Sequence, residues 1–193
     1  MRVIAGRLRG AVLEAPPGRV TRPITDRVKE ALFSVLGHRL GTAGALPDIA
    51  VLDLFAGSGA LGIESLSRGA RWCLFVERDR RAVRALRANL QKLRLLPLAT
   101  VAVGNAWTMR IPPAPGEGYG LVFIDPPYAE SGDRSRLAVL LERLVPRLAA
   151  GSLVVFRCPA TVSIAPEALW PLCRVDERVY GGMRIVLLGA GGD

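Results

Sequence analysis

The sequence has few residues of the kinds that bind metals or form disulfides: one histidine and three cysteines in 193 residues. A lone histidine cannot form a metal cluster, and Cys73, Cys158 and Cys173 lack metal-ligand spacing, so we predict no metal site. The cysteines are expected to be free thiols in a reducing compartment. The chain has no apolar run of about 18 residues, and it begins with arginines in place of an apolar core. We therefore expect neither a membrane-spanning helix nor a signal peptide, and predict a cytoplasmic protein.

Lysine is also scarce, yet the chain is strongly basic, because 24 of its 26 basic residues are arginine. The net charge is +9 and the isoelectric point is about 10.6. Residues 1–40 hold eight basic residues against three acidic ones, which is more than half of the net charge. This uneven charge predicts a polyanionic partner. A genomic bias toward arginine codons is the alternative explanation for the arginine share.

The length and the hydrophobic content of 50% predict one domain with a small N-terminal extension. We place the extension at residues 1–20 and the domain at residues 21–193. Two short strands, at 2–5 and 11–15, are expected to form a basic hairpin outside the main sheet.

After a first helix that Thr25 or Asp26 can cap, strands and helices alternate along the chain. The strands are predicted at 49–54, 72–76, 99–103, 120–124 and 152–156, and the helices at 60–68, 79–93 and 134–145. Two final strands, at 174–180 and 184–188, flank a glycine turn and form a hairpin. This order predicts an α/β fold with a doubly wound, Rossmann-like, seven-stranded sheet whose last strand pair is antiparallel.

A glycine-rich turn follows the buried strand that ends at residue 54. Gly57, Gly59 and Gly62 match the dinucleotide-binding fingerprint, and Glu77 follows Gly57 by twenty positions. The spacing fits a nicotinamide site as well as another adenosine site. Asp53 favours the second interpretation, because a buried carboxylate is costly without a partner and a cationic ligand would supply one.

The sequence Asp125-Pro126-Pro127-Tyr128 follows the strand at 120–124. An exocyclic amine on a base is a poor nucleophile, so a catalyst must hold its nitrogen in line and stabilise the developing charge. Asp125 and the carbonyl of Pro126, fixed by the rigid Pro-Pro pair, can accept the amine hydrogens, and Tyr128 can stack on an extruded base. The motif does not distinguish adenine N6, cytosine N4, guanine N2 or a protein glutamine amide.

Together, the strand and turn around Asp53 and the motif at residues 125–128 resemble the pattern of the S-adenosylmethionine-dependent methyltransferases. The resemblance implies that Asp53 faces the methionine end of the donor and that Glu77 holds the ribose hydroxyls. It also implies a polar contact to the adenine at Asn105 and Ala106.

Residues 22–33, RPITDRVKEALF, are similar to the R-P-T-T-D-R-V-R-E-x-L-F segment of small-subunit methyltransferase D, the bacterial 16S ribosomal RNA guanine-N2 methyltransferases. Residues 2–10 and 178–181 also resemble this family, and the resemblance covers essentially the full length. It implies methyl transfer from S-adenosylmethionine, leaving S-adenosylhomocysteine, to the N2 amino group of a guanine in 16S rRNA. The partner would be the 30S subunit or an assembly intermediate.

The same resemblance implies that Thr25, Arg27 and Glu30 help to close over the cofactor. The sequence departs from the family pattern at Ile24, at Lys29 and at Arg157. An acid is common at the position of Arg157, which leaves any polar role of that position open.

The predicted site residues form three groups. The catalytic residues are Asp125, Pro126, Pro127 and Tyr128. The cofactor-binding residues are Thr25, Arg27, Glu30, Asp53, Phe55, Ala56, Gly57, Ser58, Gly59, Glu77, Arg78, Asn105, Ala106 and Asp125. The RNA-binding residues are Arg2, Arg7, Arg9, Arg22, Tyr180 and Arg184. The four arginines of the helix at 79–93 are interpreted as a solvated face in preference to an RNA surface.

Three other functions compete with this interpretation. The first is an amino-methyltransferase for adenine or cytosine in DNA or for a protein glutamine, but 193 residues leave no room for a large DNA-recognition region. The second is a nicotinamide-dependent oxidoreductase, which would leave Asp53 unexplained. The third is a catalytically silent RNA-binding domain, against which the intact Asp125 and Tyr128 argue. We expect a monomer.

Overall fold

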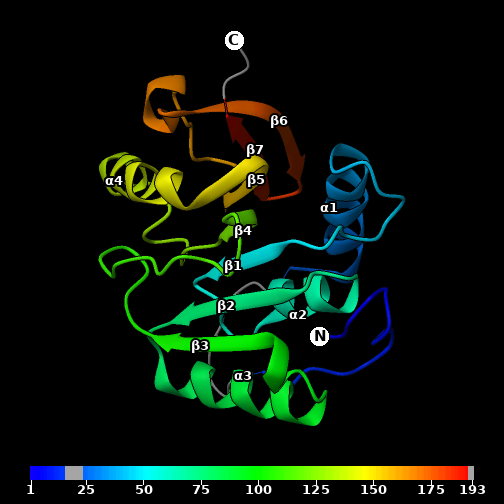
Figure 1. Cartoon of the computed structure of the whole chain (residues 1–193). Coiled ribbons are helices and arrows are strands. Elements are labelled where there is room, and N and C mark those ends of the chain that lie inside the picture. Colours follow the sequence, from blue (N-terminus) through cyan, green and yellow to red (C-terminus); the bar gives the residue numbers. More distant parts are fainter. Residues whose placement is uncertain (16–23, 191–193) are drawn as a thin grey trace.

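A computed structural model describes residues 1–15 and 24–190 of the chain (Figure 1). Within these residues, seven strands form one sheet in the order β3-β2-β1-β4-β5-β7-β6. The strands are β1 (Ala50–Leu54), β2 (Trp72–Glu77), β3 (Ala99–Val103), β4 (Tyr119–Ile124), β5 (Leu148–Pro159), β6 (Leu172–Tyr180) and β7 (Met183–Ala190). Neighbouring strands are parallel except that β7 is antiparallel to both β5 and β6. The predicted fold class is thereby confirmed.

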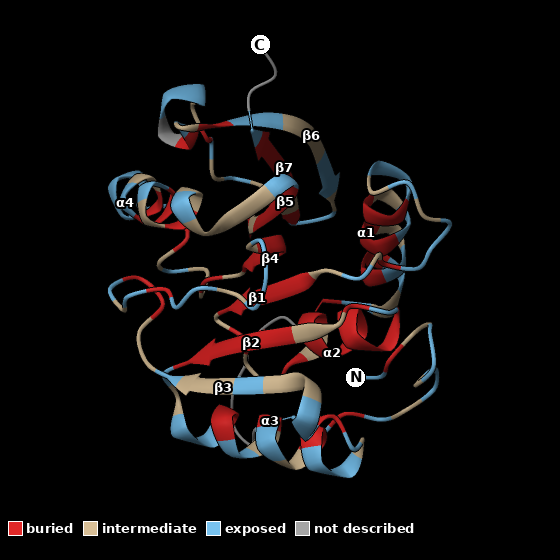
Figure 2. Cartoon of the chain, viewed as in Figure 1, coloured by how far each residue is buried: buried red, intermediate tan, exposed pale blue. Residues whose placement is uncertain are grey.

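Helices cover both faces of this sheet. The α-helices within the described residues are α1 (Asp26–Arg39), α2 (Ala60–Ser67), α3 (Arg80–Lys92) and α4 (Arg134–Leu144), and the 3-10 helices are η1 (Leu96–Leu98), η2 (Val145–Arg147) and η3 (Pro166–Leu169). Apolar residues of α1, α2 and α3 share one hydrophobic cluster with the sheet, whereas those of α4 belong to a second cluster. The helices on the two faces bury the central strands almost completely, as Figure 2 shows for β1 and β4.

The direction of winding changes between β1 and β4, and the register there aligns four strand ends. One row of paired residues runs through Val76, Leu54, Ile124 and Phe156. Charged residues follow three of these four in the sequence: Glu77 after Val76, Asp125 after Ile124 and Arg157 after Phe156. Open α/β sheets bind ligands at such a switch point, at the carboxyl ends of the strands.

The N-terminal segment does not form the two predicted strands. Arg2 and Val12 make a single antiparallel bridge instead. The two halves of the segment still pair around the turn, since Val3 N donates to Ala11 O, Gly10 N to Val3 O and Leu13 N to Met1 O, each at 2.9 Å. Ile4 N and Ala5 N donate instead to the Glu64 carboxylate of α2, at 2.8 and 3.1 Å. The segment is therefore tied to α2 and stays outside the sheet.

This segment is also part of the core. Val3 and Leu13 are buried in the cluster that α1, α2 and α3 share. Gly6 allows the close approach, because its φ is 78° and a Cβ there would lie 1.9 Å from the carbonyl oxygen of Ser67. The predicted boundary at residue 20 lies outside the described residues, so the division into extension and domain stays a prediction. No helix among the described residues is long and apolar enough to cross a membrane.

Candidate active site

A cavity of about 920 Å³ lies at the switch point of the sheet. Residues from the ends of β1, β2, β4 and β5 line it, including Asp53, residues 55–58, Glu77, Arg78, Ala106, residues 125–128 and Arg157. The glycine-rich turn and the motif at 125–128 therefore face the same space, although about 70 residues separate them in the sequence.

The turn after β1 adopts backbone conformations that few residues tolerate. Phe55 has a φ of 63°, which is uncommon for a bulky side chain, and Gly57 has a φ of 56°. Gly59 is the N-cap of α2 with a φ of 88°, and a Cβ there would lie 2.5 Å from Leu86 Cδ1. The turn is thus tight, and it begins α2 beside the cavity. Strained backbone of this kind concentrates at functional sites.

Asp53 is a buried acid within β1, with a relative exposure of 2%. Its Oδ2 accepts a hydrogen bond from Gly62 N at 2.9 Å, and no other described residue donates to the carboxylate. Burial raises the pKa of Asp53 from 3.8 to about 7, against the Gly62 hydrogen bond, and the charges of Asp125 and Glu77 raise it further. A cation in the cavity would favour the ionised carboxylate.

Glu77 ends β2, and backbone amides hold its carboxylate in place. Oε2 accepts from Gly57 N at 2.9 Å, and Oε1 accepts from Arg78 N and Asp79 N at 2.8 Å each. The acid is therefore fixed between the turn after β1 and the start of α3. A carboxylate held in this way can accept further hydroxyl hydrogens from a ligand in the cavity.

Asp125 forms an ion pair that the sequence analysis did not anticipate. Arg157 Nε donates to Asp125 Oδ1 at 2.5 Å. The side chain of Arg157 is 11% exposed and that of Asp125 is 17% exposed. Burial raises the pKa of Asp125, and the charge and hydrogen bond of Arg157 oppose that rise. β5 extends beyond both predicted ends, so Arg157 lies inside this strand. The register of β4 and β5 was the signal that could have revealed the pair.

A second group of side chains missed by the sequence analysis supports one wall of the cavity. The ring of Phe55 lies 4.9 Å from that of Trp107, and Trp107 Nε1 donates to Glu130 Oε2 at 2.7 Å. Glu130 also pairs with Arg78. The predicted cofactor residue Arg78 thus lines the cavity with its guanidinium already engaged.

Several predicted cofactor residues do not line the cavity. Thr25 caps α1 by accepting from Val28 N, and Arg27 and Glu30 are exposed on its first turns. Gly59 caps α2, and Asn105 Oδ1 accepts from Trp107 N at 3.1 Å. These residues shape or flank the site, and a direct role in binding stays a prediction.

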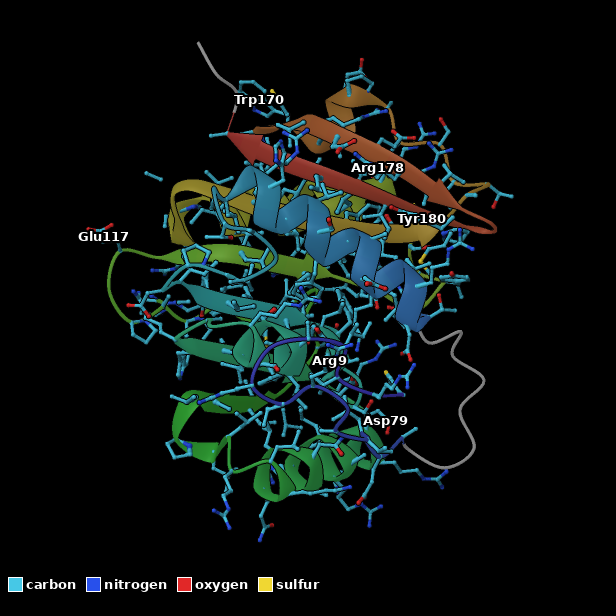
Figure 3. All side chains as sticks on the ribbon, turned by 90° about the vertical axis from the view of Figure 1, so that its right-hand side faces the viewer. Arg9, Asp79, Glu117, Trp170, Arg178 and Tyr180 are labelled. Carbon is cyan, nitrogen blue, oxygen red and sulfur yellow. The ribbon has the colours of Figure 1, made fainter. Side chains whose placement is uncertain are left out.

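The predicted RNA-binding residues that the structure describes belong to the N-terminal segment, β6 and β7. Arg7 and Arg9 are exposed on the N-terminal segment, and Figure 3 shows Arg9 there and Tyr180 at the end of β6. Arg2 pairs with Asp26 at 2.6 Å, and Arg184 pairs with Glu177. Arg22 lies outside the described residues. Arg7 and Arg9 are thus the predicted contacts whose side chains make no ion pair with another described residue.

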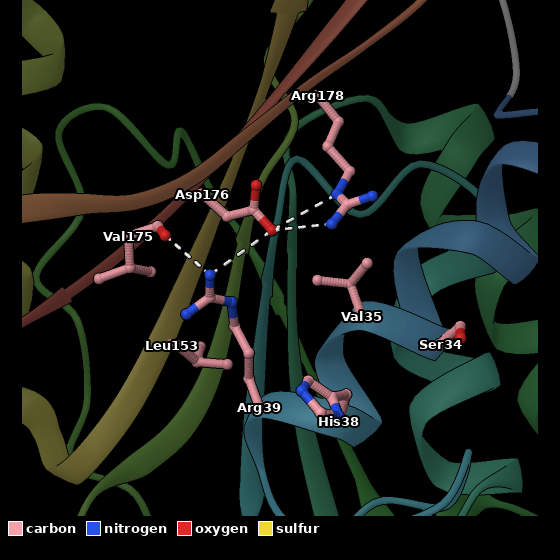
Figure 4. Close-up of a pocket in the computed structure, with 8 residues that line it drawn as sticks. All are labelled: Ser34, Val35, His38, Arg39, Leu153, Val175, Asp176 and Arg178. Carbon is pink, nitrogen blue, oxygen red and sulfur yellow. Dashed lines mark hydrogen bonds and ion pairs between the residues drawn. The ribbon is translucent and has the colours of Figure 1, made fainter.

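A smaller cavity of about 710 Å³ lies between α1 and β6 (Figure 4). Its charges are paired with one another: Asp176 lies 3.6 Å from Arg39 and 3.3 Å from Arg178. Arg39 Nη2 also donates to the carbonyl of Val175 at 2.8 Å. These contacts fasten α1 to β6, and none of the predicted site residues lines this cavity. Within residues 1–15 and 24–190, no group of three or more acids, cysteines and histidine could hold a metal ion.

Comparison with known proteins gives matches that cover between 66% and 98% of the chain. The family model described as Conserved hypothetical protein 95 matches residues 1–189. YlbH of Bacillus subtilis, an rRNA methyltransferase by name, is 38% identical over 183 residues, which cover 94% of each chain. Ribosomal RNA small subunit methyltransferase D of Escherichia coli is 39% identical over 128 residues, 66% of this chain and 60% of that protein.

The fold is similar to that of solved structures. A structure from Escherichia coli, named as a methyltransferase, has a TM-score of 0.78 and 32% sequence identity. The similarity covers 98% of this chain and 97% of that one. The N-terminal segment and the closing hairpin are therefore included in the match.

Proposed function

Since this chain belongs to the Conserved hypothetical protein 95 family, that of the small-subunit methyltransferase D proteins, we propose that it methylates ribosomal RNA. The methyl donor in this proposal is S-adenosylmethionine, and the product is S-adenosylhomocysteine. The acceptor is the exocyclic N2 amino group of a guanine in 16S rRNA, within the 30S subunit or an assembly intermediate. A cytoplasmic, monomeric enzyme that uses no metal is part of the same proposal.

One observation carries the proposal: the turn after β1 and the motif at 125–128 line a single cavity. Methyl transfer requires the donor and the acceptor nitrogen to meet in one space from which water is excluded. Two binding motifs on opposite sides of the protein could not perform this reaction.

The donor half of the cavity fits a cationic nucleoside. Asp53 is buried and lines the cavity. Its carboxylate accepts one hydrogen bond, from Gly62 N, so a cation in the cavity could serve as its counterion. Glu77 is fixed by three backbone amides and is suited to ribose hydroxyls. Bound there, the sulfonium of S-adenosylmethionine supplies an already activated methyl group. The chain therefore has to bind, orient and desolvate, and it needs no covalent intermediate.

The acceptor half is suited to a flat base with an amino group. Asp125 can accept one amine hydrogen, and the carbonyl of Pro126 can accept the other, which favours a nitrogen lone pair directed at the methyl group. Tyr128 is half-buried at the same edge and offers a ring for stacking, which contributes about 1–3 kcal/mol per base. As the S–CH3 bond breaks and the N–CH3 bond forms, positive charge develops on the nitrogen. The Asp125 carboxylate stabilises this charge and accepts the N–H proton that the methylated amine releases.

The RNA would contact the basic surface around the cavity, with Arg2, Arg7, Arg9, Arg22, Tyr180 and Arg184 as proposed contacts. Arg2 and Arg184 would have to exchange their present ion pairs for phosphates. If these five arginines meet phosphates, log affinity should fall with log salt at a slope of about −3.5.

The test is nucleoside analysis after methyl transfer. Purified protein is incubated with labelled S-adenosylmethionine in four separate reactions, which contain free 16S rRNA, 30S subunits, DNA or a protein fraction as the acceptor. The RNA is then digested and its nucleosides are separated by mass. We expect label in N2-methylguanosine from RNA alone. Label in N6-methyladenosine, in DNA or in glutamine would overturn the substrate assignment, and failure to bind S-adenosylmethionine in calorimetry would overturn the whole proposal.

A further inference from the structure

We propose that Arg157 is a positioning residue for Asp125: it anchors one carboxylate oxygen so that the other is presented to the amine of the substrate. This inference rests on the proposed methyl transfer to an amino group. It concerns a residue at which this sequence departs from the pattern of the family it resembles.

The register of the sheet creates the contact. Ile124 and Phe156 are paired, and Asp125 and Arg157 are the residues that directly follow them in the sequence. Arg157 Nε reaches Asp125 Oδ1 at 2.5 Å. The pairing of β4 with β5 therefore places the two residues close enough for their side chains to meet.

Arg157 is the better anchored member of the pair. It lies inside β5 and is paired with Ile185 of β7, whereas Asp125 is the first residue after β4. Arg157 Nη1 also lies 3.9 Å from the sulfur of the buried Met183. The strand thus holds the guanidinium, and the guanidinium holds a carboxylate that would otherwise be free to rotate at the start of a loop.

The ion pair leaves one oxygen of Asp125 able to accept a hydrogen bond in the cavity. Oδ1 is taken by Arg157, while Oδ2 receives no hydrogen bond from another described residue. Both side chains line the cavity. A carboxylate fixed by one oxygen and open at the other can accept an amine N–H in one orientation, which is the geometric requirement for in-line transfer.

Arg157 also acts on the protonation state of its partner. Burial favours the neutral acid, which would donate a hydrogen where the amine needs an acceptor. The adjacent guanidinium counteracts that effect. Without it, a larger fraction of the protein would carry a protonated Asp125 at a given pH, and the acid limb of the rate profile would lie at higher pH.

The experiment compares wild type with Arg157→Met and Arg157→Lys at saturating donor and RNA, as kcat against pH. An opposite charge at this distance lowers a carboxyl pKa by about 1–3 units, so the acid limb of Arg157→Met should move up by at least about one unit. Its plateau kcat should fall on the order of tenfold, with KM for the donor within about twofold. Arg157→Lys should restore part of the pH shift but less of the plateau rate, because an ammonium lacks the fixed fork of a guanidinium.

Three controls separate this role from a structural one. Arg136→Met removes an exposed arginine of α4 that pairs with the N-cap residue Asp133, and should leave the profile unchanged. Arg157→Gln replaces Arg157→Met if the apolar variant does not fold, and the same shift is expected. In an Asp125→Asn background, Arg157→Met should produce no further shift of the acid limb.

An unchanged acid limb and plateau in Arg157→Met or Arg157→Gln would overturn the inference. A shift that persists in the Asp125→Asn background would also overturn it. These outcomes differ from failure of the proposed function, in which wild type transfers no methyl group to RNA. If wild type methylates another amino group, the same variants are assayed on that substrate.

Discussion

Two clusters in this protein join carboxylates to basic side chains, and they differ in how deeply they are buried and in how completely the carboxylate is satisfied. The Glu64 cluster, made of Glu64, Lys29 and Arg68, lies beneath the N-terminal segment, with side-chain exposures of 0%, 0% and 5%. The Asp125 pair, made of Asp125 and Arg157, lies at the cavity with exposures of 17% and 11%.

In the Glu64 cluster every oxygen is used. Oε2 lies 3.1 Å from Lys29 Nζ and accepts from Ile4 N, and Oε1 accepts from Arg68 Nε at 2.8 Å and from Ala5 N. Asp125 has a single partner on one oxygen. A saturated buried cluster stabilises one arrangement of the chain, whereas an incompletely satisfied one is available to a ligand. The first cluster is therefore expected to control stability, and the second to control turnover.

The largest expected effect is the loss of stability in Glu64→Gln. The change leaves Lys29 and Arg68 buried without a counterion, which should lower the free energy of unfolding by about 3–5 kcal/mol in urea denaturation. Glu142→Gln, at an exposed position on α4, is the matched control and should change it by less than about 0.5 kcal/mol. A loss in Glu64→Gln no larger than in the control would remove the distinction between the two clusters.

The Asp125 pair should give the opposite pattern. Asp125→Ala should reduce kcat by at least about a hundredfold, because the acceptor for the amine hydrogen is lost. Donor affinity, measured by calorimetry, should change by no more than about threefold, and the free energy of unfolding should fall by less than in Glu64→Gln. Equal losses of turnover and donor binding would show that Asp125 belongs to the donor site.

The two clusters also differ in how far the sequence could predict them. The alternation of strands and helices, the turn at Gly57 and the motif at Asp125 follow from local patterns, and the structure brings the turn and the motif to one cavity as the fold class requires. The Glu64 cluster could not be predicted, because it joins α1, α2 and the N-terminal segment, which no local pattern relates.

The N-terminal hairpin was predicted only in part, for the same reason. Its two segments pair antiparallel at the bridge between Arg2 and Val12, but the amides of Ile4 and Ala5 donate to Glu64 and no strand forms there. The pair between Asp125 and Arg157 could have been predicted in part. The fold class places β4 beside β5, but the pairing of Ile124 with Phe156 could be predicted only if the true end of β5 were known.

Asp53 gives a pH dependence that separates donor binding from turnover. Its folded pKa of about 7 lies above the usual 3.8, so its contribution to stability is complete below pH 3.8 and is lost as the pH rises through about 7. A cationic donor binds the ionised form, so its affinity should fall by up to about tenfold per unit as the pH drops below about 7. Calorimetry across this range provides the measurement. Asp53→Asn should remove the dependence, and a flat profile in wild type would contradict the assignment.

The smallest expected effect concerns the segment that the Glu64 cluster holds. Replacing Arg7 and Arg9 together by Gln should leave the free energy of unfolding within about 0.5 kcal/mol, because both side chains are exposed. The slope of log RNA affinity against log salt should become shallower by about 1.4, from two lost phosphate contacts. Arg84→Gln with Arg87→Gln, on the exposed face of α3, is the matched control and should leave the slope unchanged. Equal changes in both pairs would place α3 on the RNA surface.

The most direct test of the central claim is a crystal structure of this chain with S-adenosylhomocysteine. The ligand should fill the cavity between the turn after β1 and residues 125–128, with its adenosine near Glu77 and Ala106. Its sulfur should lie between Asp53 and Asp125, facing the space beside Tyr128. A ligand bound elsewhere, or one whose sulfur faces away from Asp125, would contradict the claim that donor and base share one cavity.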